Sequence, residues 1–479
     1  MNVLVPITMF GWIPAVIAIF ALLPPRRAVI AAFLLAWLFL PMASYKVPGI
    51  TAYTKMTATC VGIMIAAALF DAGRIVAFRP RWTDLPMAVW CICPFASSIS
   101  NGLGVYDGLS AMTYQTITWG LPYLIGRLYF SDGMGIRELA IGIFVGGLVY
   151  MPFCLYEIKM SPQLHNLVYG FSVASWLEVK RFGGWRPMVF MQHGLMVGMW
   201  MVTTSLIGIW LWATGALCRL WGWPVAWLLV PLILTTILCK SAGAIALMFV
   251  GLVVLFLMRW PRSSLPAWCL LIAAPLYMGT RALGVWKGDE LLSLSLSTAG
   301  NERADSLEFR LRNEDMLAAK ALERPIFGWG GWGRSRVYNG EGDDVSVTDG
   351  LWIIALGQNG VVGLTALSAA MLLPGSLLVL RYPTRRLSHP AVAPAAALIV
   401  LLALYMIDNL MNGMVNPIFA AASGAATGFS SGPLLSAAIA ARPRVPVGRT
   451  RNMSNGMRPP QMIAATSLPS AKARQAALP

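Results

Sequence analysis

The chain contains few charged residues and almost no histidine. Only 12% of its 479 residues are charged and only three are histidine, whereas a soluble domain has about 25% charged residues. This shortage of charge argues against a soluble globular protein, and three histidines are too few for a histidine-based metal site. The seven cysteines lie in or beside apolar segments, and Cys91-Ile92-Cys93 has neither metal nor redox spacing. We therefore expect no metal and no other cofactor.

Apolar residues, by contrast, are abundant and come in long runs. They make up 57% of the chain, and the mean hydropathy is +0.67. A helix needs about 20 apolar residues to cross a bilayer. The sequence therefore predicts an all-α polytopic membrane protein, a bundle of about 12–13 transmembrane helices with one large polar loop outside the membrane. The predicted spans are residues 3–23, 28–43, 57–73, 85–100, 108–130, 136–156, 188–213, 223–239, 242–258, 265–284, 350–380, 391–412 and 414–439.

The net charge of +16 comes from basic residues spread over short loops and the C-terminal tail. They form no basic patch with interleaved aromatic residues, so we expect no nucleic-acid partner. Short basic loops usually face the cytoplasm, which places the N-terminus and segments 157–187 and 281–349 outside and the C-terminus inside. We expect a transmembrane helical domain over 1–440. A basic, disordered cytoplasmic tail follows over 441–479, which either lies on anionic lipid or only keeps the chain soluble.

One long polar segment, residues 281–349, interrupts the apolar pattern. It holds twelve of the twenty acidic residues and nine basic ones, and a polar insert of this length between spans is more often functional than passive. Apolar residues at 307, 311, 316, 317, 318, 321 and 322 predict an amphipathic helix that ends before Pro325. Arg310 and Arg312 lie near its start.

A turn rich in glycine and tryptophan follows this helix, over residues 325–334. It is a weak phosphate-binding signal because no strand precedes it. The next predicted span, 350–380, is too long for one straight crossing. We expect it either to extend beyond the membrane or to break near Pro374.

A second outward segment, residues 157–187, ends with three cations and two glycines. Lys180, Arg181 and Arg186 surround Gly183-Gly184, a composition suited to gripping a phosphate. The alternative is that these cations, with aromatic neighbours such as Trp176, are interfacial anchors. Elsewhere, Lys240 either binds substrate or snorkels at a turn between spans. Asp408 within a late span faces either a protein cavity or the water interface.

Several motifs, taken in order, resemble those of the O-antigen ligase and polymerase family of bacterial envelope proteins. They are Arg181-x-x-Gly184, Lys240-Ser241-Ala242-Gly243-Ala244, Arg310 followed by Pro325-x-x-Gly328-x-Gly330, and Gly360-Val361-Val362-Gly363-Leu364. The similarity covers about residues 175–375. It implies a helical bundle of about a dozen spans in the bacterial inner membrane, with one large periplasmic loop.

The resemblance also implies an activity. Family members transfer a glycan from a polyprenyl-diphosphate carrier to a sugar or lipid-glycan acceptor without a metal, in surface polysaccharide biosynthesis. The implied partners are this donor, the acceptor, the lipid bilayer and other polysaccharide assembly proteins. Many relatives have a histidine before the span that follows the loop, where this chain has Asp349. A carboxylate can serve as general base in its place.

The required chemistry assigns roles to the candidate residues. Breaking a sugar–diphosphate bond needs cations on the departing oxygens and a base on the incoming hydroxyl. Asp349 is the candidate base, and the candidates for substrate binding are Arg181, Arg186, Arg310, Arg312 and Lys240. The alternative for each arginine is a salt bridge within its loop. The alternative for Asp349 is an N-cap of the following helix.

Two other classes of function compete with the transferase. A lipid-linked glycan transporter or flippase would show internal repeats and broken helices near the midplane, and we find no clear repeat. A non-catalytic subunit of a polysaccharide assembly machine would fit the replacement of the usual histidine. The transferase accounts better for a 69-residue polar insert, residues 281–349.

Overall fold

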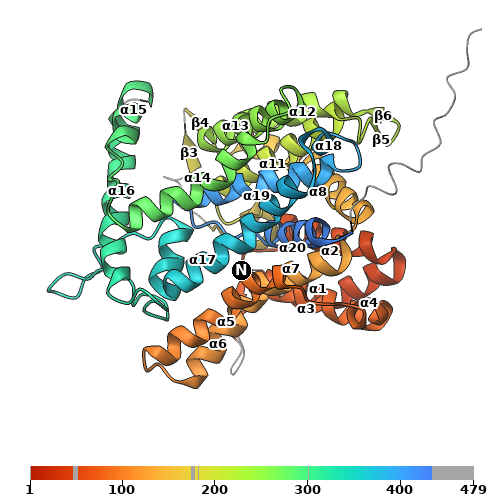
Figure 1. Ribbon diagram of the computed structural model, residues 1–479. Helices are drawn as coiled ribbons and strands as arrows, with labels where there is room; N and C mark the ends of the chain where they lie inside the picture. The colour runs from red at the N-terminus through yellow and green to blue at the C-terminus, as the bar shows by residue number, and fades with distance from the viewer. Residues whose placement is uncertain (1, 47–51, 174–178, 182, 300, 434–479) are drawn as a thin grey trace, which may run out of the picture. The chain divides into compact units, whose positions relative to one another are not determined.

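The structure, a computed structural model, describes residues 2–46, 52–173, 179–181, 183–299 and 301–433. The predicted disordered tail, 441–479, therefore lies outside the described residues, as do Trp176 and Phe182. The described chain is mostly helical and has almost no sheet (Figure 1). Its strands form three antiparallel pairs of two residues each: β1 (Ser44–Tyr45) with β2 (Tyr53–Thr54), β3 (Lys180–Arg181) with β4 (Gly184–Trp185), and β5 (Arg219–Leu220) with β6 (Trp223–Pro224).

Every predicted span contains helix. The helices are α1 (Leu4–Leu22), α2 (Pro25–Phe39), α3 (Lys55–Phe70), α5 (Leu85–Ser100), α6 (Val105–Gln115) with α7 (Leu121–Tyr129), α8 (Gly133–Met160), α11 (Gly194–Ala213), α12 (Val225–Leu238), α13 (Ala242–Arg259), α14 (Leu265–Ala282), α17 (Leu351–Arg381), α19 (Ala393–Met411) and α20 (Pro417–Ser431). Among the described helices, α1, α8, α11, α13, α17 and α19 are long and apolar enough to cross a membrane. An all-α membrane protein is the fold class that these helices support.

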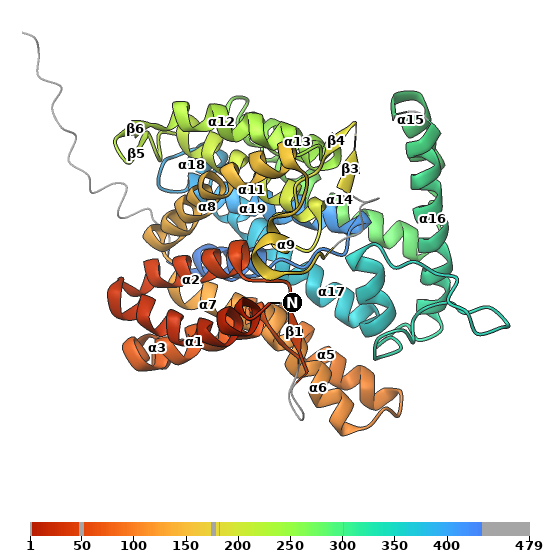
Figure 2. The same cartoon turned by 180° about the vertical axis from the view of Figure 1, so that it is seen from behind.

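The remaining elements are short or belong to the polar segments. They are α4 (Ala72–Val76), η1 (Trp82–Asp84), the π-helical turn η2 (Thr116–Gly120), α9 (Leu164–Tyr169), α15 (Asp289–Ala299), α16 (Asn301–Leu322) and α18 (Thr384–Leu387). The amphipathic helix predicted before Pro325 is α16, which begins somewhat earlier than its apolar pattern suggested. In both views α15 and α16 stand at one side of the helical bundle (Figures 1 and 2).

Two apolar helices form the centre of the fold. In α11 and in α19, 16 residues each are buried, as expected of a helix that is apolar on every face. They contact each other, and α8, α12, α13, α14, α17 and α20 surround them. This core explains why both segments read as continuous apolar runs with no polar face.

Small residues bring α20 unusually close to α7. A Cβ on Gly424 would lie 2.0 Å from the carbonyl oxygen of Tyr123, and a Cβ on Gly126 would lie 2.0 Å from that of Ala421. Close approach through glycine, alanine and serine is a common way for membrane helices to associate, because lipid provides no hydrophobic drive between them. The α7–α20 contact therefore depends on the absence of side chains.

Of the two alternatives for the span at 350–380, the break near Pro374 is wrong, because α17 breaks at Gly360 instead. Gly360 has φ +65° and ψ −167°, outside the helical region. Proline cannot donate a hydrogen bond to the carbonyl four residues earlier, but the hydroxyl of Ser423 donates to that carbonyl, Ala370 O, at 2.6 Å. The helix therefore continues through Pro374, and residues 361–381 suffice for one crossing.

Candidate functional site

The glycine-rich turn of the polar segment docks onto the break in α17. The N–H of Trp329 donates to the carbonyl of Gly357 at 2.8 Å, and that of Gly330 donates to Gln358 at 3.1 Å. In return, the N–H of Val361 donates to the carbonyl of Pro325 at 2.7 Å. The turn thus satisfies backbone groups that the break would otherwise leave without partners.

Two glycines are required for this docking. A Cβ on Gly328 would lie 2.6 Å from the carbonyl carbon of Gln358, and a Cβ on Gly360 would lie 2.3 Å from the carbonyl oxygen of Ile326. Both residues also have positive φ, a conformation that glycine adopts without a steric penalty. The two glycine motifs that carry the family resemblance therefore pack against each other, and the N–H groups of Trp329 and Gly330 hold α17 rather than a phosphate.

Helix α5 completes the support of this break. The hydroxyl of Ser97 donates to the carbonyl of Gln358 at 2.7 Å, and the side-chain amide of Asn101 donates to the carbonyl of Gly328 at 2.8 Å. Because both the turn and α17 are tied to α5, the start of α17 has a fixed position relative to the bundle.

A buried ion pair anchors α16 to the bundle. Arg281, at the end of α14, is 2% exposed and its Nε lies 3.3 Å from a carboxylate oxygen of Glu314. Tyr277 and Trp352 also donate to Glu314, at 2.7 and 3.1 Å. Burial raises the pKa of Glu314, and the hydrogen bonds from Tyr277, Trp352 and Arg281 act in the opposite direction. Removing one partner of such a buried pair is expected to cost about 3–5 kcal/mol.

The anchored helix presents Arg310 to Asp349, two of the predicted site residues. The Nε of Arg310 lies 3.4 Å from a carboxylate oxygen of Asp349, and the two side chains are 34% and 39% exposed. A single long contact at this exposure contributes only about 0–1 kcal/mol, so a stronger anion can displace it. The N-cap position of α17 is occupied by Gly350, and no side chain caps this helix. This goes against the alternative that Asp349 is a helix cap.

Asp408 adds a second carboxylate beside Arg310. It lies near the end of α19, accepts a hydrogen bond from the side-chain amide of Asn412 at 3.1 Å, and interacts electrostatically with Arg310. Arg310 also donates to the carbonyl of Met411 at 3.3 Å. The sequence marked Asp408 only as a polar residue in a span. Its position beside Arg310 depends on the approach of α16 to α19, for which the sequence contains no signal.

Arg312 does not join this group. It is mostly exposed, 78% by side chain, and its Nε lies 3.6 Å from Glu308 one turn earlier on α16. For Arg312 the predicted alternative, a salt bridge within the loop, describes the structure. Its role in substrate binding has no geometric support.

The other predicted cations, Arg181, Arg186 and Lys240, form a second group at the β3–β4 hairpin. The Nζ of Lys240 donates to the carbonyl of Arg181 at 3.3 Å, and Nη2 of Arg186 donates to the carbonyl of Lys240 at 3.2 Å. A Cβ on Gly184 would lie 2.1 Å from Nζ of Lys240. Glycine at this position therefore makes room for the lysine. Lys240 itself has φ +54°, a conformation that costs a non-glycine residue about 1–2 kcal/mol.

Arg186 is the least expected member of this group because its charge is buried without a carboxylate. It is 7% exposed, its Nε has no hydrogen-bond partner, and the described residues provide it with no ion pair. Burial lowers the pKa of Arg186, and the charge of Arg181 acts in the same direction. An arginine nevertheless stays charged, and a buried charge without a counter-ion is costly. The arrangement favours binding of an anion from outside the chain.

The structure thus divides the predicted site residues into two groups built on different elements. Arg310 and Asp349, joined by Asp408, lie between α16, α17 and α19. Arg181, Arg186 and Lys240 lie at the β3–β4 hairpin and the turn before α13. Among the described residues, no cluster of three or more metal-ligating side chains occurs. No family model matches the chain, and a comparison with curated proteins gives no match.

Proposed function

We propose that this protein is a membrane glycosyltransferase of the O-antigen ligase and polymerase type. It would transfer a glycan from a polyprenyl-diphosphate carrier to a sugar acceptor at the outer face of the bacterial inner membrane. The observation that carries the proposal is the buried guanidinium of Arg186, which lacks a carboxylate partner within the described residues and lies beside Arg181 and Lys240. A diphosphate is the doubly charged group that such a cationic cluster suits.

The reaction requires little beyond placement and charge. The acceptor hydroxyl attacks the anomeric carbon of the donor sugar, the bond from that carbon to the diphosphate oxygen breaks, and polyprenyl diphosphate leaves with the bonding electrons. Arg181, Arg186 and Lys240 stabilise the negative charge that develops on the leaving group. No metal is needed for this step if fixed cations supply the charge.

Asp349 is the proposed base for the acceptor hydroxyl, whose proton it takes. Its carboxylate is 39% exposed and has Arg310 as its partner, so a hydroxyl can reach it from the water side. Arg310 would release Asp349 when the diphosphate arrives and contribute a further cation to the leaving group. The half-exposed, single contact between the two side chains is compatible with that exchange.

Analysis of lipid-linked glycans after deletion of the gene tests this function. Accumulated single repeats on the carrier would indicate a polymerase, and accumulated full-length polymer would indicate a ligase. Carrier-linked glycan retained on the cytoplasmic face would instead indicate a transporter, and unchanged surface glycans would contradict all three.

Purified protein with a carrier-linked donor and an acceptor tests the assignment of Arg186. Arg186→Gln should lower the transfer rate about ten- to a hundredfold, since one charge-assisted contact is worth about 1.5–3 kcal/mol. Arg312→Gln is the matched control, because Arg312 is an exposed arginine outside both groups. Equal activity of the two variants would remove Arg186 from the donor site. If Arg186→Gln lowers the melting temperature as well, Arg186→Lys, which keeps the charge, should restore part of the activity.

A further inference from the structure

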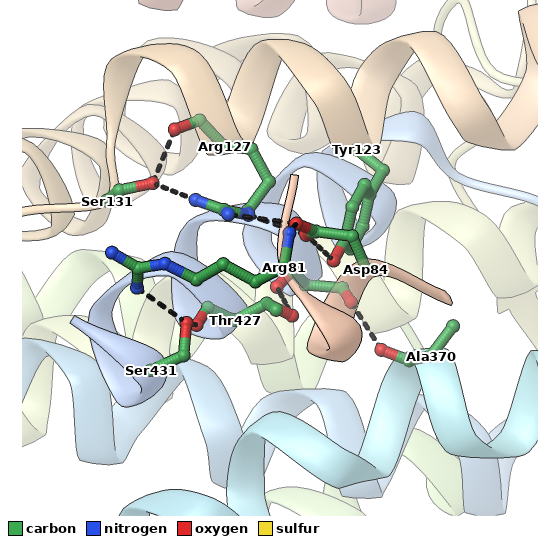
Figure 3. A network of polar contacts seen from close by, with 9 residues as sticks. Arg81, Asp84, Tyr123, Arg127, Ser131, Ala370, Thr427 and Ser431 are labelled. Atoms are coloured by element: carbon green, nitrogen blue, oxygen red, sulfur yellow. Dashed lines mark hydrogen bonds and ion pairs between the residues drawn. The ribbon is translucent and has the colours of Figure 1, made fainter. Parts of the chain in front are cut away.

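A cavity of about 280 Å³ lies among the short basic loops. None of the residues that line it belongs to either group of proposed site residues. The cavity forms where η1, the end of α17 and the end of α20 meet. Its polar lining comes from Thr83, Arg381, Ser430 and Ser431. Arg81 reaches the same place, because its Nη1 donates to the hydroxyl of Ser431 at 3.0 Å (Figure 3).

Two positive charges at this cavity have no acidic partner in the described part of the chain. Arg381 donates to the carbonyl of Ser430 at 2.7 Å, and Arg81 donates to Ser431. Asp84, three residues after Arg81, is already saturated with hydrogen bonds. It receives Nε and Nη2 of Arg127 at 2.7 and 2.9 Å, the hydroxyl of Tyr123 and the N–H of Arg81 (Figure 3). The charges of Arg81 and Arg381 therefore remain unbalanced.

Capping of helix ends explains only part of this arrangement. The carbonyl ends of α17 and α20 lie here, and a cation is favourable at a helix C-terminus. That accounts for the bond from Arg381 to Ser430. Within the described residues, the other N–H groups of the two guanidiniums have no partner, and capping gives them none.

Thr83 provides an independent sign of a missing ligand. It lines the cavity, is only 3% exposed, and its hydroxyl has no hydrogen-bond partner within the described residues. A buried hydroxyl without a partner is costly. A ligand oxygen in the cavity would remove this cost.

The rest of the lining is apolar, which identifies the ligand as amphiphilic. Leu377 and Leu380, from the last turns of α17, line the cavity together with Trp82. Leu380 is 73% exposed and Trp82 is 68% exposed. Tryptophan beside arginine at the end of a membrane helix is typical of the headgroup level of a bilayer. A soluble anion would have no use for this apolar wall.

We propose that the cavity binds one anionic phospholipid. Its phosphate lies between Arg81 and Arg381, an oxygen of the headgroup accepts or donates a bond at Thr83, and an acyl chain runs along Leu377 and Leu380. This inference is independent of the glycan chemistry, since none of these residues belongs to either group of proposed site residues.

Native mass spectrometry of the delipidated full chain tests this site. Phosphatidylglycerol is titrated against phosphatidylcholine with the same acyl chains. Arg81→Gln and Arg381→Gln should each weaken phosphatidylglycerol binding about tenfold, the effect of one charge-assisted contact, and leave phosphatidylcholine binding unchanged. Arg385→Gln is the matched control, because Arg385 is an exposed arginine on α18, four residues after Arg381, and does not line the cavity.

Three results would overturn the proposal. Equal weakening by Arg385→Gln would mean that lipid is attracted only by the general surface charge. Equal affinity for phosphatidylcholine would mean that the anionic headgroup is not recognised. Competition by glycerol phosphate at the same concentration as lipid would mean a site for a free phosphate. Arg381 also caps α20, so Arg381→Gln could unfold the protein, and in that case the result for the exposed Arg81→Gln decides. Thr83→Val should weaken lipid binding without changing the charge of the cavity.

Discussion

Substitution of Gly328 by alanine tests the docking of the polar segment onto α17. The new Cβ would lie 2.6 Å from the carbonyl carbon of Gln358 and 2.6 Å from the backbone nitrogen of Gly360. Both neighbours are backbone atoms, so no side chain can rotate away to make room. Either the turn or the first half of α17 must move.

The expected cost has two parts, and the chain offers a control for each. Gly328 has φ +69°, and alanine in this region costs about 1–2 kcal/mol. The overlap with backbone adds about 1–3 kcal/mol, the usual range for overpacking. Gly342 has φ +89°, but a Cβ there would meet nothing within 4 Å. Gly340 has no positive φ, and a Cβ there would also meet nothing within 4 Å. The free energy of unfolding should therefore fall most for Gly328→Ala, less for Gly342→Ala, and hardly at all for Gly340→Ala.

Thermal unfolding in detergent, followed by size-exclusion chromatography of the heated samples, ranks the three variants. Limited proteolysis gives a local measure, because undocking of the turn should expose the backbone near Trp329 to cleavage. If Gly328→Ala has the same melting temperature as Gly342→Ala and is cleaved no faster, the turn is not docked on α17 as described. The account of the break at Gly360 would then fail with it.

Four further outcomes are expected. Arg310→Ala should lower glycan transfer about ten- to a hundredfold, whereas Arg312→Ala on the same helix should not; equal rates would remove Arg310 from the site. Asp349→Asn should lower transfer at least about a hundredfold while unfolding changes by less than about 1 kcal/mol, and full activity would exclude it as the base. A cysteine at the exposed Gly340 should react with an impermeant thiol reagent in intact spheroplasts of a strain without other accessible thiols, and labelling only after lysis would reverse the predicted orientation. Burial raises the pKa of Asp84, but hydrogen bonds from its arginine, backbone and tyrosine partners outweigh burial and leave the pKa below its ordinary value. The stability it contributes is present above about pH 4 and is lost as the pH falls through the lowered value, so Asp84→Asn should flatten the acid limb of a melting-temperature profile.

The helices could be predicted from the sequence because apolar runs of membrane length have few other structures available. The position of the break in α17 could not. Pro374 has the stronger local signal, but Ser423, about fifty residues away in sequence, supplies the bond that the proline lacks. The helix breaks at Gly360 where a turn about thirty residues earlier bonds the backbone on either side of it, at Gly357, Gln358 and Val361. Local sequence contains neither partner.

The candidate site, like the fold, could be predicted from the sequence only in part. The family resemblance and the required chemistry selected Arg310 and Asp349 in the polar segment, and the structure brings them together. The same reasoning selected Arg312, which lies two residues away on α16 and is mostly exposed. The position of Asp408 beside Arg310 could not be predicted, because it depends on the approach of α16 to α19. The burial of Arg186 could not be predicted either, because it depends on the fold around the β3–β4 hairpin. Chemistry at a residue could be anticipated from its type, whereas its neighbours could not.

The break in α17 also constrains how the protein matures during synthesis. The first half of α17, residues 351–359, is too short to cross a bilayer, which takes about 20 residues. Its last carbonyls obtain donors from Trp329 and Gly330, which leave the ribosome first. The polar segment must therefore fold and remain beside the emerging helix before that half can settle among apolar neighbours. A delay in this step would leave an inserted chain with exposed backbone polar groups, the kind of intermediate that membrane proteases remove.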